Sequence, residues 1–174
     1  MPTTYEPCPQ SVADFAARVL NEFHPELAQA SVTIDYAFAV NEDEDEHAMK
    51  IRGQRVLARV KLYNLEDRAR GRDDAKICID KVWWDGAEES ERKAVMDHEH
   101  EHLQFSKVWR DEDGALCWKT DDLGRPKLKL KNHDAEAGIF MNVIQRHGDA
   151  SADLANIKRI GNAIRKVIQR QFWG

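Results

Sequence analysis

The chain has 174 residues, of which 42% are hydrophobic and 33% are charged, and its formal net charge is −5. This length supports a hydrophobic core without disulfides or structural metals, so we expect one globular domain over residues 1–174. The acidic net charge argues against a protein whose main task is nucleic-acid binding. The chain has no apolar run long enough to cross a bilayer and no signal peptide, which argues against a membrane protein.

The first half of the chain predicts one helix followed by a series of strands. Its apolar pattern places these elements in order: a helix over residues 11–24, strands over 32–40, within 54–64 and over 76–84, and a polar connection at 64–74. Ser11 is the expected N-cap of the helix, and Pro25 ends it. On the last strand Trp83 and Trp84 point to opposite faces, so one is expected in the core and the other can line a cleft.

Residues 95–105, VMDHEHEHLQF, alternate histidine and glutamate on a helix predicted over residues 87–107. Residues four apart share a helix face, so His98 and His102 can bind one metal ion, whereas His100 points elsewhere. Glu99 adjoins the first of this pair, which gives the pattern H-E-x-x-H. In zinc hydrolases with this pattern, both imidazoles bind Zn²⁺ and the glutamate is the general base toward water.

The same stretch is also compatible with a solvated, charged helix that binds no metal. Against this, His98 and His102 fall on a stripe with Ala94, Val95 and Phe105 at helical spacing. Unpaired burial of two histidines is costly, so the stripe favours a metal. On the other faces of this helix, His100 and Glu101 are expected to be exposed to solvent and to take no part in the site.

The second half predicts a hairpin, a short strand and two helices. The hairpin covers residues 108–120 and turns at Asp113-Gly114, and the lysine-rich strand covers 125–132. A helix over 134–147 has Asp134 as its expected N-cap. The last helix, over 150–174, is basic and amphipathic, and Ser151 is its expected N-cap. We expect its apolar side to pack on the core, with nucleic-acid binding by its basic side as a less favoured alternative.

A catalytic zinc site needs a third protein ligand besides the helix pair. The residues after the motif that offer one are His133, Asp134, Glu136 and His147. His133 is expected at the junction between the lysine-rich strand and the next helix, from which it can reach the motif helix. His147, at the end of that helix, has another explanation, because a cationic side chain is favoured at a helix C-terminus.

The chain resembles the phage metallopeptidase domain family, whose members carry a D-H-E-L-x-H helix and a later H-D-x-x-E-F segment. The matching segments here are residues 97–103 and 133–140, and the likeness extends over about residues 15–148. A more distant resemblance is to SprT-like metalloproteases. The chain departs from the family pattern at His100, at Ala137-Gly138 and in the tail after residue 148.

The resemblance implies an α+β, zincin-like minimal metalloprotease domain, in which a small twisted sheet of three to five strands packs on the motif helix with flanking helices. It also implies one Zn²⁺ per chain, held by His98, His102 and His133, with Glu99 as the catalytic base. Asp134 and Glu136 are candidates for holding a ligand imidazole in place.

Two functions follow as hypotheses. The first is a zinc metallopeptidase that acts on a peptide or protein substrate, with Tyr63 or His147 as an oxyanion donor. The second is a non-catalytic phage accessory protein that binds a host or phage protein, or nucleic acid, with zinc structural or absent. The presence of Glu99 favours the enzyme, because a structural site needs no base. Three widely spaced cysteines, Cys8, Cys78 and Cys117, indicate reduced thiols in a cytoplasmic protein. The resemblance to a phage family implies that this is the cytoplasm of a bacterial host.

Overall fold

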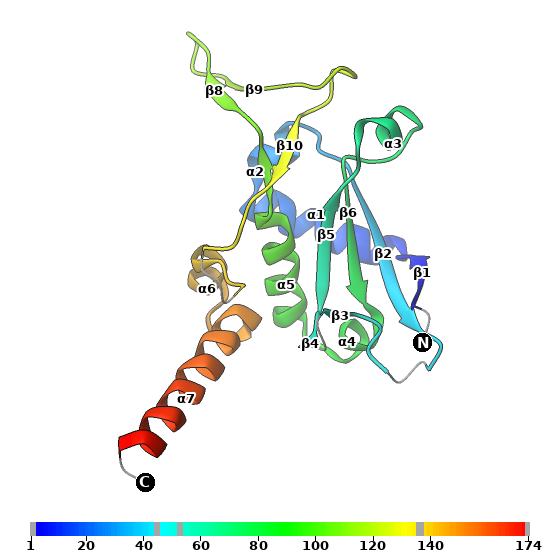
Figure 1. The fold of residues 1–174 in the computed structure, drawn as a ribbon. Coiled ribbons are helices and arrows are strands. Elements are labelled where there is room, and N and C mark those ends of the chain that lie inside the picture. Colours follow the sequence, from blue (N-terminus) through cyan, green and yellow to red (C-terminus); the bar gives the residue numbers. More distant parts are fainter. Residues whose placement is uncertain (1–2, 44–45, 52–53, 135–137, 173–174) are drawn as a thin grey trace.

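A computed structural model describes residues 3–43, 46–51, 54–134 and 138–172, and the side chains of the last helix as far as Ala163. Its centre is a four-stranded sheet with the order β1-β2-β6-β5 (Figure 1). The strands are β1 Thr3–Pro7, β2 Ile34–Asn41, β5 Ala58–Leu62 and β6 Ala75–Asp80. The two central strands, β2 and β6, are parallel, and both outer strands are antiparallel to their neighbours.

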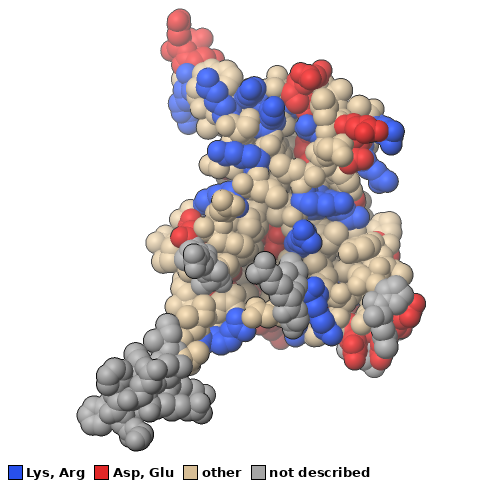
Figure 2. Space-filling model, viewed as in Figure 1, with Lys and Arg blue, Asp and Glu red and all other residues tan. Residues whose placement is uncertain are grey.

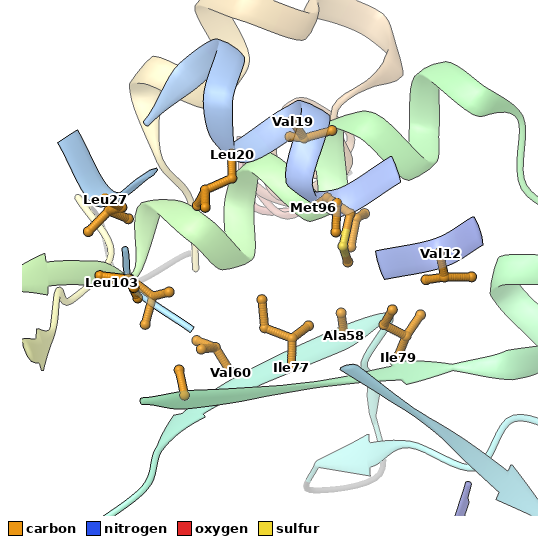
Figure 3. Close-up of a cluster of buried hydrophobic side chains, with 14 of the residues drawn as sticks. Val12, Val19, Leu20, Leu27, Ala58, Val60, Ile77, Ile79, Met96 and Leu103 are labelled. Atoms are coloured by element: carbon orange, nitrogen blue, oxygen red, sulfur yellow. The ribbon is translucent and has the colours of Figure 1, made fainter. Parts of the chain in front are cut away.

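Helices α1 Gln10–Phe23 and α5 Glu89–Glu101 enclose the hydrophobic core together with the sheet. Figure 3 shows apolar side chains of α1, such as Val19, facing Ile77 and Ile79 of β6, with Met96 of α5 alongside. Ile77, Ile79 and Met96 are each fully buried. The predicted arrangement, a small sheet packed on the motif helix with flanking helices, is confirmed.

Several boundaries in the first half differ from the sequence prediction. Helix α1 begins at Gln10 with Pro9 as its N-cap, so the prediction that Ser11 caps it is wrong. The third predicted strand stops at Asp80, because the Asp80 carboxylate accepts the backbone N–H of Trp83 at 3.0 Å and starts helix α4 Lys81–Gly86. Trp83 and Trp84 therefore lie on a helix, and both are buried.

Shorter elements complete the first half: α2 Pro25–Gln29 after α1, the pair β3 Lys50–Ile51 and β4 Gln54–Arg55, and α3 Leu65–Ala69. Helix α3 occupies the predicted polar connection, and the Asn64 side chain caps it by accepting the N–H of Asp67 at 2.8 Å. Strand β1 was not predicted, because its sequence TTYEP has no apolar alternation and its residues are mostly exposed.

After α5 the chain forms β7 Leu103–Phe105, which pairs with β10 Leu128–Leu130. Between them lies the predicted hairpin, formed by β8 Val108–Arg110 and β9 Leu116–Trp118. Helix α6 Met141–His147 starts seven residues later than predicted, with Phe140 as its N-cap. Asp134 is not the N-cap residue, although its carboxylate accepts the N–H of Met141 in the first turn at 2.8 Å.

A short 3₁₀ turn, η1 Gly148–Ala150, leads into α7 Ala152–Phe172, which extends away from the body of the molecule (Figure 1). Ser151 caps α7 as predicted, since its hydroxyl accepts the N–H of Asp153 at 3.1 Å. Leu154 on the apolar side of this helix is half-buried, but Ile157 and Ile160 are each 37% exposed, so the prediction that this side packs on the core is wrong for these two residues. The remaining apolar residues assigned to that side, Ile164, Val167, Ile168 and Phe172, lie outside the described side chains.

The described part of the chain contains no helix with the length and apolar character needed to cross a membrane. All three cysteines are free thiols, as predicted.

Candidate active site

Three histidine side chains from two distant segments meet beside the end of α5. His98 lies in the last turn of this helix, His102 is its C-cap residue, and His133 lies in the loop after β10. His98 Nε2 is 3.1 Å from His133 Nε2, and one ring nitrogen of each histidine lies within 4.8 Å of the other two. His133 is not at the start of the next helix as predicted, because seven residues lie between it and Met141, where α6 begins.

The two helix histidines are oriented through their Nδ1 atoms. His98 Nδ1 donates to the Asp153 carboxylate at 2.8 Å, and His102 Nδ1 donates to the backbone carbonyl of Lys131 at 2.8 Å. A ring whose Nδ1 carries the proton has its lone pair on Nε2, which is the form that binds metals. Each Nε2 atom is therefore available to a shared cation.

Phe140 forms the floor beneath the three rings. It is fully buried, and its ring centroid is 5.0 Å from those of His98 and His133 and 4.8 Å from that of His102. Its backbone N–H donates to Asp153 at 2.7 Å, so one carboxylate fixes both the floor and a histidine. Asp153 could not be predicted as a site residue from the sequence. Acidic residues are common in the first turn of any helix, where they interact favourably with the helix dipole.

The electrostatics of the three rings fit a bound cation. Burial lowers the pKa of His102 to about 4 and also lowers that of His133. For His98, burial acts in the same direction, but the hydrogen bond to Asp153 and the nearby Glu99 raise the pKa overall. The Nε2 atoms of His98 and His133 lie only 3.1 Å apart, so their lone pairs would repel each other without a proton or a metal cation between them. Three imidazole nitrogen donors this close together suit Zn²⁺, which binds them in their neutral form.

Glu99 faces the same space from α5 and is 5% exposed. Burial raises the pKa of its carboxyl to about 7, while the charge of His98 and the backbone N–H of Val60 oppose this rise. Together with the three histidines, Glu99 lines a cavity of about 730 Å³ between α5, β5 and the start of α7. Trp83 also lines this cavity and Trp84 does not, in line with the prediction that one of the two tryptophans lines the cleft.

Asp97 and Glu101 of α5 belong to a separate polar network outside the cavity lining. Asp97 is fully buried and accepts hydrogen bonds from His24 at 2.7 Å, His147 at 2.8 Å and Arg146 at 2.8 Å. Glu101 accepts from Lys131 Nζ at 2.6 Å. Two cationic side chains thus balance the two carboxylates, and this group has no need of a metal.

His100 and Glu101 are both buried, so the prediction that they are exposed is wrong. His100 bonds Tyr36 Oη through Nε2 at 3.1 Å, and burial lowers its pKa to about 3, which keeps the ring neutral. The reason is that α5 is covered on several sides, by α1, α6, α7 and β5, and has no broad face left for solvent.

We expect Asp97→Ala to lower the free energy of unfolding by about 3–5 kcal/mol, because it leaves two imidazoles without their acceptor and the charge of Arg146 with only its longer contact to Glu101, at 3.4 Å. Hydrogen bonds from His147 and His24 hold the pKa of Asp97 below its ordinary value of 3.8 despite its burial. The folded state therefore favours the carboxylate, and this contribution is present above about pH 4 and declines as the pH falls. Urea unfolding, with exposed Asp14→Ala as control, measures the effect; equal losses in both variants would contradict it.

Of the remaining predicted residues, neither oxyanion candidate lines the cavity. His147 bonds Asp97, and the Tyr63 hydroxyl donates to Asp35 at 2.9 Å, so both predictions are wrong. Asp134 bonds the first turn of α6 and no histidine among the described residues. Glu136 lies outside the described residues. Among the described residues, the polar donors that line the cavity include Arg55, Arg59 and Asn156, none of which belongs to a recognisable motif.

Among curated proteins and among solved structures, none matches the chain. Residues 3–165 match the family described as Putative phage metallopeptidase. The match starts before residue 15 and ends after residue 148, so it is wider than the resemblance in the sequence suggested. It takes in β1 and the first part of α7 with Asp153. Because the match covers most of its length, the chain belongs to this family.

Proposed function

We propose that this protein is a zinc-dependent peptidase in which His98, His102 and His133 hold the metal and Glu99 is the general base. One observation carries the proposal: three imidazoles with ring nitrogens within 4.8 Å of one another and one buried carboxylate line the same cavity. Membership of a metallopeptidase family supports both the metal and the class of reaction.

Each side chain has a role that its surroundings support. When bound, Zn²⁺ supplies Lewis acidity, which makes a water molecule more acidic and polarises a substrate carbonyl. A carboxylate oxygen of Glu99 would accept a proton from the attacking water as the water oxygen bonds to the carbonyl carbon, and would deliver that proton to the amine nitrogen as the C–N bond breaks. A pKa near 7 suits both halves of this transfer. Asp153 and the Lys131 carbonyl keep the histidine rings in the orientation that exposes Nε2.

The cavity can also bind a polypeptide next to these groups. Residues 56–60, mostly in β5, form one wall, and β5 is an outer strand of the sheet. An extended peptide can lie along such an edge, and the side-chain amide of Asn156 is an N–H donor available to the oxyanion. A non-catalytic metal site would have no use for a buried carboxylate facing an open cavity, which favours the enzyme over the binding protein.

The test is cleavage of an unfolded protein. We expect the zinc-loaded protein to produce fragments, a metal chelator to stop cleavage, and added Zn²⁺ to restore it. Mass spectrometry of the products identifies the bonds that are cut. Cleavage that continues unchanged in excess chelator, or no cleavage of any unfolded protein by a fully zinc-loaded sample, would refute the proposal.

A further inference from the structure

Arginine and lysine side chains gather on the face of the molecule that carries β5 and the β8–β10 region (Figure 2). Arg55 and Arg59 line the cavity itself. Lys61 lies two residues after Arg59 on β5, and both side chains are exposed. Ala58, before Arg59, and Val60, between the two cations, are buried. This grouping is local, since the chain as a whole has a net charge of −5.

The cavity lining also holds two carboxylates, and the charge of Arg59 acts on one of them, Glu99, but among the described residues neither carboxylate forms an ion pair with these cations. The acidic residues among its lining are Glu99 and Asp153, and both are buried. Asp153 is already bonded to His98 and to Phe140 N–H. Within the described part of the chain, Arg55 and Arg59 form no ion pair with an acidic side chain. Their guanidinium groups are therefore free to bind a carboxylate from another molecule.

We propose that the substrate of this site is an acidic polypeptide segment, whose Asp or Glu side chains bind Arg55, Arg59 and Lys61. This inference rests on the proposed function and names its substrate class. Arg59 and Lys61 are two apart on a strand, so their side chains lie on one face about 7 Å apart. Alternate residues of an extended peptide have the same spacing, so an acidic residue at every second position matches the two cations.

A nucleic acid is also negatively charged, but the cavity suits it less well. Single-stranded nucleic acids bind through aromatic platforms on which their bases stack. The aromatic residue in the lining apart from the histidines is Trp83, which is only 9% exposed. The rest of the wall includes aliphatic side chains such as Val56 and Leu130, which pack against the side chains of a peptide.

The experiment measures binding without hydrolysis. Zinc-loaded Glu99→Gln protein is titrated into two fluorescently labelled, unstructured peptides that differ only in having Asp and Glu or Asn and Gln at alternate positions. We expect at least about tenfold tighter binding of the acidic peptide at low salt and a smaller ratio as salt is added, because exposed ion pairs are screened. Equal affinity for the two peptides would overturn the proposal.

Charge variants in the same background locate the preference. Arg59→Glu and the milder Arg59→Gln should reduce the preference for the acidic peptide. Arg18→Glu, an equal charge change on exposed Arg18 of α1 outside the cavity lining, should keep it. A preference that survives in Arg59→Glu, or displacement of the peptide by a single-stranded oligonucleotide at lower concentration than by the acidic peptide itself, would overturn the proposal.

The two proposals fail in different ways. If the wild-type protein cleaves acidic and amide peptides equally well, only the substrate class is wrong. If the wild-type protein cleaves nothing but the Glu99→Gln protein still prefers the acidic peptide, the peptidase function is wrong and the acidic binding site stands.

Discussion

Glu99→Gln is expected to lower the rate of peptide hydrolysis by a factor of about 10²–10⁴, which is the usual contribution of a general base. Glutamine has nearly the shape of glutamate but cannot accept the proton of the attacking water. Glu99 is 5% exposed and lies at the cavity wall, so the amide fits the same space. The fold and the zinc content should therefore be unchanged.

The matched control is Glu89→Gln, because Glu89 lies in the first turn of the same helix and is exposed. Glu101, the other glutamate in the alternating His-Glu segment, is unsuitable as a control, since it is buried and bonded to Lys131. Cleavage of the same unfolded protein is compared for the wild type and both variants, with zinc measured in each. Wild-type activity in Glu99→Gln would mean that another group accepts the proton.

Helix geometry alone predicted the face of α5 that carries His98, Glu99 and His102, because a spacing of four residues leaves few alternatives. The opposite faces could not be predicted in the same way. The prediction that His100 and Glu101 are exposed assumed that a helix with many charged residues has one face in contact with solvent. In this protein the buried carboxylates of α5 bind cationic side chains that lie 30 or more residues away in the sequence. Asp97 accepts from Arg146, and Glu101 accepts from Lys131.

Long-range contacts also explain the other misses. Asp153 is 55 residues from the histidine that it orients, and nothing in its local sequence distinguishes it from an ordinary residue in the first turn of a helix. Strand β1 forms because β2 offers it an edge to pair with, and not because of its own apolar pattern. Trp83 reaches the cavity only because the Asp80 side chain turns a strand into a helix.

Zinc affinity should separate the three histidines from the residues that orient them. We expect the wild-type protein to bind one Zn²⁺ per chain. His133→Ala is the cleanest removal of a ligand, because His133 is exposed in a loop and its loss leaves no cavity in the core. Loss of a residue that only hydrogen-bonds to a metal ligand typically weakens metal binding by about 10–100-fold. Loss of the ligand His133 itself should therefore weaken zinc binding by more than about 100-fold.

Asp153→Asn tests the smaller effect expected for a residue that orients a ligand without binding the metal. Its amide oxygen can still accept the Phe140 N–H, but the negative charge beside His98 Nδ1 is lost, so zinc binding should weaken by about 10–100-fold. Asp149→Asn is the control, since Asp149 is exposed and bonded only to Lys158 among the described residues. Titration against a zinc-chelating dye, on samples whose folding is checked by circular dichroism, measures all three variants. Should His133→Ala bind zinc as tightly as Asp149→Asn does, the metal would lie elsewhere. If Asp153→Asn matched His133→Ala instead, the carboxylate would itself be a ligand.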